Sequence, residues 1–143
     1  MKKINRRAGF NYELLDKLEV GVVLTGAEAK AVRNNHIDLT RSFARLMSGE
    51  LFLVNASIPL DNMPNYQATR SRKLLLHKRE LKSLIGKMGQ LGLTLVPTKV
   101  YTKGRRVKLE IALARSRRLY QKKQVRKLRD IKRDIERELR VKE

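Results

Sequence analysis

The sequence predicts a single, mainly β domain with added helices, followed by a strongly basic C-terminal tail. Short β-branched or alternating segments are separated by turn residues, a pattern typical of a small β domain. The 143 residues are enough for one domain with a modest core. The formal net charge of +20 is concentrated at the end of the chain, where residues 115–143 hold 13 Lys and Arg against 5 Asp and Glu.

The first predicted strand is the apolar, β-branched segment Val20–Leu24. It ends at Thr25, whose hydroxyl has capping-box spacing to the Glu28 carboxylate three residues later. A short helix is therefore predicted over about residues 27–33. Asn34-Asn35 can supply the left-handed residue that ends it.

Two strands, SFARLM (42–47) and LFLVNASI (51–58), follow and are joined through a turn at Ser48-Gly49-Glu50. Pro59–Arg72 contains two prolines and many turn formers, which predict an exposed loop. Apolar residues at helical spacing then predict an amphipathic helix from about His77 to Met88.

The last two predicted strands, 93–101 and 107–114, flank a turn at Lys103-Gly104. Pro97 lacks an N–H donor and pushes the first of them toward a sheet edge or a bend. The predicted order is strand, helix, two strands, loop, helix, two strands, tail. This order favours a small barrel of the OB type, which binds oligonucleotides on its face and loops.

Three consecutive leucines, 74–76, lie within the basic stretch RSRKLLLHKR (70–79). They cannot all face one core, so we expect two of them to anchor the joint between loop and helix. The third is expected to be exposed beside Arg72 and Lys73. An apolar side chain among cations suits a nucleotide surface better than a purely electrostatic one.

The tail carries a thin apolar stripe that consists of Val125, Leu128, Ile131, Ile135 and Leu139. Lys and Arg fill most of the other positions. Because its charges repel one another, we expect residues 116–143 to be largely disordered when free and to become helical on an anionic partner. A membrane-surface helix is the alternative. The stripe lacks Trp and Phe, which favours RNA.

Enzymatic function has little support in the sequence. The chain has no cysteine, and its two histidines, His36 and His77, have no metal-ligand spacing. Nucleophile-elbow and phosphate-loop motifs are absent. We therefore predict no catalytic residue, no metal, no cofactor and no small-molecule substrate. A nuclease is an alternative without support.

The charge points instead to a polyanionic partner. No apolar window approaches the length of a spanning helix, and the N-terminal charges precede no apolar stretch, so we expect neither a membrane partner nor a secretory signal. Clusters of basic residues lie at segment ends, where they can converge on one RNA-binding surface: Arg6-Arg7, Arg70/Arg72/Lys73, Lys78-Arg79, Arg105-Arg106 and Arg117-Arg118.

Several of these segments, in order and spacing, resemble the SmpB family of bacterial proteins, the partners of transfer-messenger RNA (tmRNA). The resemblance lies in Asn5–Ala8, Gly21–Arg33, Ser42–Leu53, Arg70–Leu81 and Gly92–Tyr101. Its most specific element is RxRKLLLHKxEL. It implies an OB-type barrel, residues 1–115, that holds the tRNA-like domain of tmRNA. The tail, residues 116–143, would enter the decoding centre and the mRNA channel of a stalled ribosome.

The resemblance also implies a cytoplasmic, non-enzymatic adaptor for trans-translation, present as a monomer with one copy per tmRNA. Asn5, Glu19 and Leu75 match positions at which the family contacts its RNA. The basic clusters add Arg6, Arg7, Arg70, Arg72 and Lys73 to the expected RNA contacts. In the tail, the residues expected in the ribosome are Arg117, Arg118, Tyr120, Lys122, Lys123, Arg126, Lys127, Lys132 and Arg133.

The chain departs from the family pattern at the junction of body and tail. Ser116-Arg117-Arg118 replaces the usual Gly-Lys-Lys, and Gln121-Lys122-Lys123 replaces the usual Asp-Lys-Arg after the aromatic position. The charge is kept, while a glycine and an acid are lost. A general OB-type RNA-binding or ribosome-associated protein without tmRNA specificity is the alternative function.

Overall fold

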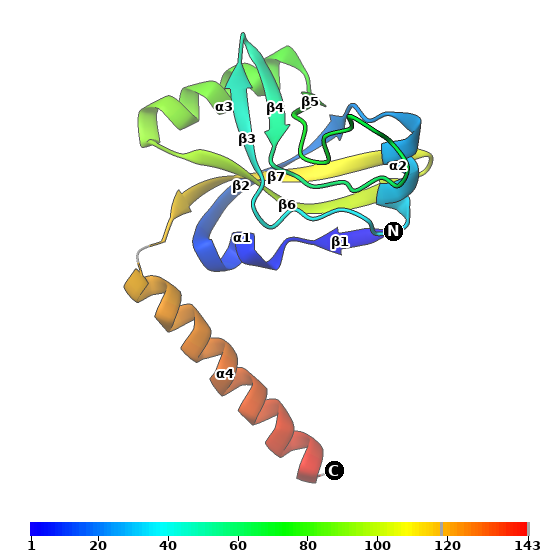
Figure 1. The fold of residues 1–143 in the computed structure, drawn as a ribbon. Helices are drawn as coiled ribbons and strands as arrows, with labels where there is room; N and C mark the ends of the chain where they lie inside the picture. The colour runs from blue at the N-terminus through cyan, green and yellow to red at the C-terminus, as the bar shows by residue number, and fades with distance from the viewer. Residues whose placement is uncertain (118, 143) are drawn as a thin grey trace.

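The computed structural model describes residues 1–117 and 119–142. The described elements are β1 (Lys2–Ile4), α1 (Arg6–Asn11), β2 (Tyr12–Val22), α2 (Gly26–Arg33), β3 (Phe43–Met47), β4 (Glu50–Val54), β5 (Arg72–Leu75), α3 (Lys78–Leu91), β6 (Thr94–Lys103), β7 (Arg106–Ser116) and α4 (Leu119–Lys142). Figure 1 shows the strands gathered into one body, with α4 running away from it.

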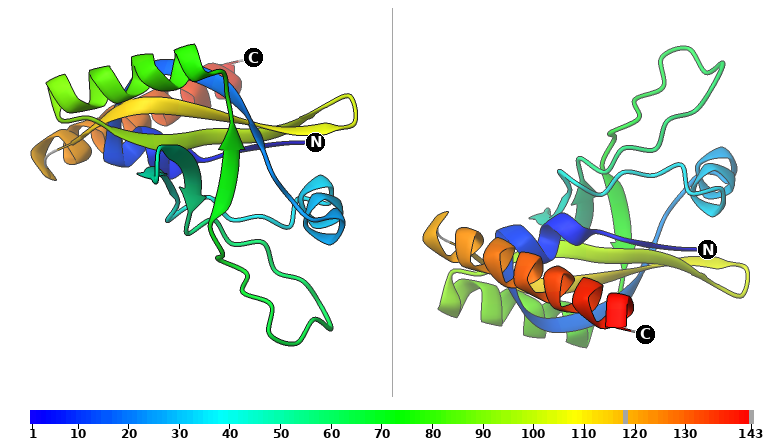
Figure 2. Two further views of the ribbon diagram at one scale, coloured as in Figure 1. Left: turned by 90° about the horizontal axis from the view of Figure 1, so that it is seen from above. Right: turned by 90° about the horizontal axis from the view of Figure 1, so that it is seen from below.

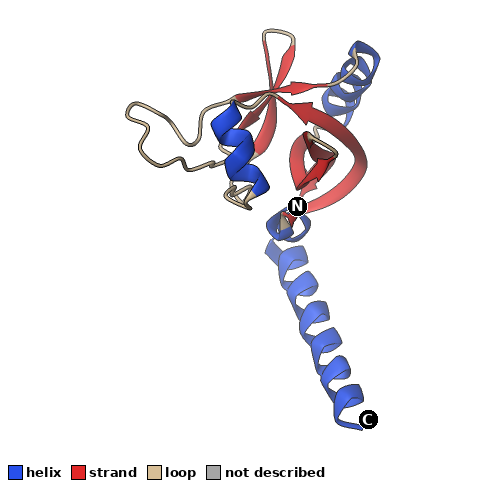
Figure 3. Cartoon of the chain, turned by 90° about the vertical axis from the view of Figure 1, so that its right-hand side faces the viewer, coloured by secondary structure: helices blue, strands red, loops and turns tan. Residues whose placement is uncertain are grey.

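The seven strands form one antiparallel sheet that closes on itself. Their order is β1-β6-β3-β4-β5-β2-β7, and β6 also pairs with β7. The path from β6 through β3, β4, β5, β2 and β7 therefore returns to β6. Strand β1 pairs with residues 99–101 of β6, whereas β3 meets β6 at Leu95. Figure 3 shows the strands curving around a common interior. The predicted mainly β barrel with added helices is confirmed.

Residues that pair across neighbouring strands fill the barrel interior. Val20, Leu109 and Val100 face each other across β2, β7 and β6, and each is only 1% exposed. Val32 of α2 and Leu84 of α3 close the core from outside the sheet. This burial is the main stabilising term of the fold, since each fully buried aliphatic side chain contributes about 1.5–3 kcal/mol.

The turn and cap signals of the sequence are confirmed. Ser48 and Gly49 both have positive φ in a two-residue hairpin between β3 and β4. Thr25 and Glu28 form the capping box of α2, and Asn35 has the left-handed conformation after that helix. Pro97 lies at a register shift in β6 next to Lys99, so it marks a bend inside the sheet rather than an edge.

Four elements differ most from the sequence-based expectation. The segment of β1 and α1 was not predicted, because a three-residue strand and a six-residue helix are too short for a periodic signal. Strand β2 begins at Tyr12 rather than Val20, since a register shift between Leu14 and Lys17 interrupts its alternation. The stretch from Arg72 to Leu75, expected as loop and joint, is strand β5.

Candidate nucleic-acid interface

The outer surface of the barrel carries a continuous row of side chains across five strands. Leu75 of β5 pairs with Gly21 of β2, which pairs with Lys108 of β7. Lys108 pairs in turn with Tyr101 of β6, and Tyr101 with Lys2 of β1. Paired residues share one face of an antiparallel sheet. The row therefore combines an apolar, an aromatic and two basic side chains on one outer face.

Leu75 is the exposed leucine that the sequence predicted. Its exposed fraction is 51%, whereas that of Leu74 is 2%. Strand alternation in β5 causes this difference, because Arg72 and Leu74 point inward and Lys73 and Leu75 outward. Gly21 leaves room for Leu75, since a Cβ built there would lie 3.2 Å from Leu75 Cβ.

A groove with basic side chains along it lies beside Leu75. Its apolar residues include Val22, Leu24 and Val107, and the basic residues Arg33, Arg105, Arg106 and Lys108 also line it. Arg33 Nη2 donates a hydrogen bond to Arg105 O at 2.6 Å, which ties α2 to the β6–β7 hairpin. An apolar floor with cationic side chains can receive a nucleotide, with the base on the floor and the phosphate on the cations.

Glu19 lies on the same outer face, with 38% of its side chain exposed. The Tyr101 hydroxyl donates a hydrogen bond to its carboxylate, and Lys103 Nζ lies 3.5 Å from its other oxygen. The bond from Tyr101 and the charge of Lys103 lower the pKa of Glu19 in spite of its partial burial. Burial and the bond to Glu19 raise the pKa of Tyr101 to about 12. The pair thus presents an ionised acceptor, suited to the donor groups of RNA. Sequence reasoning assigned Tyr101 no role.

Asn5 lies at the end of β1, between the barrel and α1. Its Nδ2 donates to Leu39 O at 3.2 Å and to Pro97 O at 2.9 Å. The amide group therefore positions the start of α1, where Arg6 and Arg7 are exposed. Arg6 lines a hollow together with Lys2 and Lys99 of the outer face. The structure gives Asn5 a positioning role that the sequence did not indicate.

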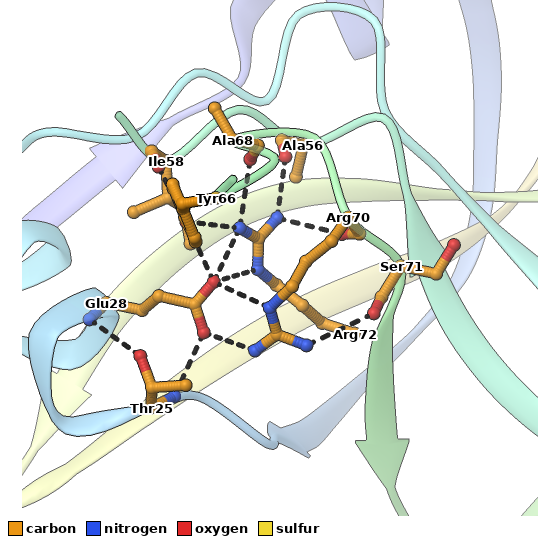
Figure 4. Close-up of polar contacts among 9 residues, drawn as sticks. All are labelled: Thr25, Glu28, Ala56, Ile58, Tyr66, Ala68, Arg70, Ser71 and Arg72. Carbon is orange, nitrogen blue, oxygen red and sulfur yellow. Dashed lines mark hydrogen bonds and ion pairs between the residues drawn. The ribbon is translucent and has the colours of Figure 1, made fainter. Parts of the chain in front are cut away.

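Arg70 and Arg72 do not lie on this surface but form a cluster around the Glu28 carboxylate (Figure 4). Arg72 Nε and Nη2 donate to Glu28 Oε2 at 3.0 and 2.7 Å. Arg70 donates from Nε to the same oxygen at 3.0 Å and from Nη2 to Oε1. The Tyr66 hydroxyl lies 2.9 Å from Glu28 Oε2 and 2.8 Å from Ile58 O. The cluster joins α2, β5 and the loop before β5.

This cluster corrects the prediction of an RNA contact for Arg72. The Arg72 side chain is fully buried, as is that of Glu28. Its guanidinium also donates to the carbonyls of Ala56 at 2.8 Å and Ala68 at 2.9 Å. No part of it can reach an RNA. Arg70 keeps 35% of its side chain exposed, although its guanidinium is bound to Glu28. Lys73, paired with Glu50 at 3.1 Å, is freely accessible.

We expect acid to destabilise the fold through Glu28. Burial raises the pKa of Glu28, but the hydrogen bonds from Arg70, Thr25 and Arg72 outweigh it and lower that pKa from its usual 4.5 to about 2. The stabilisation is therefore complete above about pH 5 and is lost as the pH falls from 4.5 towards 2. The loss is on the order of 3 kcal/mol.

Urea unfolding of the wild type and of Glu28→Gln between pH 6 and pH 3 checks this expectation. The variant lacks the titrating carboxylate, so the difference between the two free energies of unfolding should shrink as the pH falls. A difference that is constant over this range would contradict the assignment.

The tail continues from β7 as helix α4. Arg117 links it to the body, since its N–H donates to Asn11 O at 2.9 Å and its Nε to Tyr12 O at 3.1 Å. Arg118 lies outside the described residues, as does the side chain of Tyr120. The other expected ribosome contacts lie on α4, where Lys122 is half-buried and Lys123, Arg126, Lys127, Lys132 and Arg133 are exposed. Disorder of the free tail stays a prediction.

Comparison with known proteins gives the family. Residues 3–141 match the family model described as SmpB protein. The chain belongs to the SmpB family. The resemblance inferred from its motifs is thereby confirmed, and it extends over both the barrel and the tail of this SmpB-family protein.

Relatives and a solved structure similar to this SmpB-family protein match most of the chain. An SsrA-binding protein of Carboxydothermus hydrogenoformans is 44% identical over 147 aligned positions, which span 99% of each chain. An SsrA-binding protein of Bartonella quintana is 48% identical and covers 88% of this chain. A solved structure described as "tmRNA-SmpB: a journey to the center of the bacterial ribosome" superposes with a TM-score of 0.68 at 44% identity. It covers 82% of this chain and 85% of the other.

Two further observations concern metal-binding groups and membrane-spanning helices in the described part of this SmpB-family chain. Within residues 1–117 and 119–142, no three His, Asp or Glu side chains gather in a group able to hold a metal ion. No helix in the same residues is both long and apolar enough to cross a membrane.

Proposed function

We propose that this chain is an RNA-binding adaptor that binds the tRNA-like domain of tmRNA and delivers it to stalled ribosomes for trans-translation. The observation that carries the proposal is the outer face of the barrel, where Leu75 and Glu19 lie on neighbouring strands among basic side chains. Its similar proteins are named SsrA-binding proteins, and its solved neighbour is a complex of tmRNA and SmpB. Both support the same partner.

The barrel and the tail have separate tasks in this proposal. The body, residues 1–115, holds the RNA through Asn5, Arg6, Arg7, Glu19, Lys73 and Leu75, with Arg70 at the margin. The tail, residues 116–143, enters the decoding centre and the mRNA channel through its basic residues. The exposed cations of α4 support this role, because an RNA-lined channel attracts a basic helix. One monomer acts per tmRNA in the cytoplasm.

The adaptor is not an enzyme in this proposal. A metal-dependent nuclease would shorten its RNA during prolonged incubation with Mg²⁺. We expect the tRNA-like RNA to run as an intact band after such incubation, and the appearance of shorter fragments would contradict the assignment.

The experiment that tests the function is a binding titration with the tRNA-like domain of tmRNA, with plain tRNA as competitor, at two salt concentrations. Recognition of shape by the outer face predicts binding that survives the competitor at the higher salt. Purely electrostatic binding would be equal for both RNAs and would fall steeply with salt. That result would favour a general RNA-binding protein.

Leu75→Asp is expected to weaken binding of the tRNA-like RNA at least about tenfold, which corresponds to about 1.4 kcal/mol. The change removes an apolar contact and places a negative charge on the RNA-binding face. The thermal midpoint should change little, since half of the Leu75 side chain is already exposed. Leu46→Asp, at a leucine of β3 that is 38% exposed, is the matched control and should bind normally. A large loss of thermal stability in Leu75→Asp would instead assign Leu75 to the core.

A further inference from the structure

Five arginines and one phenylalanine line a hollow between α1 and α4. Arg6, Arg7 and Phe10 come from α1, and Arg126, Arg129 and Arg133 come from α4. The three arginines of α4 are spaced i, i+3 and i+7, so they lie on one face of that helix. Figures 1 and 2 show α4 starting beside the body and passing below α1 and β1.

The charge of this hollow is not neutralised by the protein. No acidic side chain lines it, and none of the ion pairs among the described residues involves one of its five arginines. A neighbouring hollow shares Arg6, Arg129 and Arg133 and includes Glu110. That carboxylate is already paired with Lys17 and Lys99. Five guanidinium groups this close together repel one another unless an anion lies between them.

Three apolar residues of α4 are exposed rather than packed on the body. The exposed fractions are 66% for Leu128, 46% for Ile131 and 53% for Ile135. The face turned towards α1 is the basic one. On that face, the guanidinium carbon of Arg126 lies 5.3 Å from the centre of the Phe10 ring. One such contact, worth about 0.5–1 kcal/mol at an exposed site, does not offset the repulsion.

We propose that the hollow between α1 and α4 binds phosphate groups of an RNA backbone, and that this binding holds α4 against the body. Guanidinium groups bind phosphate oxygens in pairs of parallel hydrogen bonds, and an aromatic ring beside them is typical of sites that follow single-stranded RNA. The inference rests on the proposed function in that the phosphate belongs to bound RNA.

This site gives the tail a second position. Arg126 and Arg133 are also among the residues proposed to enter the ribosome, and they cannot contact both partners at once. The tail therefore lies along the body when the protein binds its RNA away from the ribosome. It must leave α1 before it enters the mRNA channel.

The absence of cysteine makes the position of the tail measurable, because single cysteines can be introduced for labelling without background. Spin labels at Lys82→Cys on α3 and Glu136→Cys on α4 report the distance between body and tail, since both side chains are exposed. The distance distribution of the full chain is measured alone, with the tRNA-like RNA and with inorganic pyrophosphate. We expect a broad distribution without anion and a single narrow one with RNA.

The deciding comparison uses two triple variants that each remove three positive charges from α4. Arg126→Gln/Arg129→Gln/Arg133→Gln changes the hollow, whereas Lys123→Gln/Lys127→Gln/Lys132→Gln changes basic residues of α4 that do not line it. With RNA, the arginine variant should keep the broad distance distribution. The lysine variant should show the single narrow distribution of the wild type, which we call closure. Equal closure of both variants, or a narrow distribution without anion, overturns the proposal.

The two anions separate the source of the phosphate. Closure by pyrophosphate but not by bound RNA would assign the hollow to free phosphate compounds and overturn the RNA assignment. If the wild type does not bind the tRNA-like RNA, the proposed function fails. If the distance distribution of the wild type also stays broad with pyrophosphate, the phosphate site is overturned as well, independently of the proposed function.

Discussion

Arg72→Met is expected to lower the free energy of unfolding by about 3–5 kcal/mol, the cost of removing one partner of a buried ion pair. The Glu28 carboxylate would remain fully buried with only Arg70 as a cationic partner. The carbonyls of Ala56 and Ala68 would lose the donors that now lie 2.8 and 2.9 Å away. Because the cluster joins α2 and β5, the loss should affect the whole barrel in a single transition.

Lys73→Met is the matched control, since it changes the next residue of β5 and removes the same charge. Its ion pair with Glu50 is exposed, so the cost should be below about 1 kcal/mol. Urea unfolding at neutral pH gives both values. The RNA affinity of Arg72→Met is measured separately, at a temperature at which this variant is folded. It should equal the affinity of the wild type for the tRNA-like RNA. Weakened RNA binding with unchanged stability would show that Arg72 contacts the RNA and is not buried.

Deletion of residues 116–143 is expected to abolish rescue of stalled ribosomes while the preference for tmRNA over plain tRNA remains. The residues proposed to recognise the RNA lie on the barrel, and the deletion removes the basic helix proposed to enter the mRNA channel. The absolute affinity for RNA should fall, because the deletion removes the contacts of Arg126, Arg129 and Arg133. The salt dependence of RNA binding should fall as well, since fewer phosphates are neutralised. The measurements are peptide tagging on stalled ribosomes and the two-RNA competition.

The full-length Leu75→Asp variant is the complementary test, because it changes the RNA-binding face and leaves the tail intact. It keeps the whole tail, and RNA binding and rescue should weaken together. A truncated protein that no longer distinguishes tmRNA from tRNA would contradict the division at residue 116. A thermal melt of the truncated protein is the control for folding, because the deletion also removes the hydrogen bonds of Arg117 to Asn11 and Tyr12.

The main elements of the body could be predicted because their signals are local. The Thr25 and Glu28 cap and the Ser48-Gly49 turn depend on neighbours within a few residues, and the structure contains both. One of the three adjacent leucines was also expected to be exposed, because they cannot all face one core, and the family resemblance pointed to Leu75, which the structure exposes. The family, too, was evident from motifs whose order and spacing are written in the chain.

The role of an individual arginine could not be predicted in this way. Arg70, Arg72 and Lys73 are nearly adjacent and similar in charge, yet the structure buries Arg72, binds Arg70 to Glu28 and leaves Lys73 on the surface. Strand alternation decides which side chain points inward, and Glu28, 44 positions before Arg72, decides that a charge can be buried there.

The sequence by itself therefore determined the β-barrel class, the basic character and the family, because periodicity, composition and motif spacing are properties of the linear chain. Only the tertiary structure decided which cations remain for RNA, and that Arg6 and Arg7 share a hollow with three arginines more than 110 positions away. The physical reason is that burial and charge pairing are set by contacts between distant residues, which closure of the barrel and the placement of α4 create.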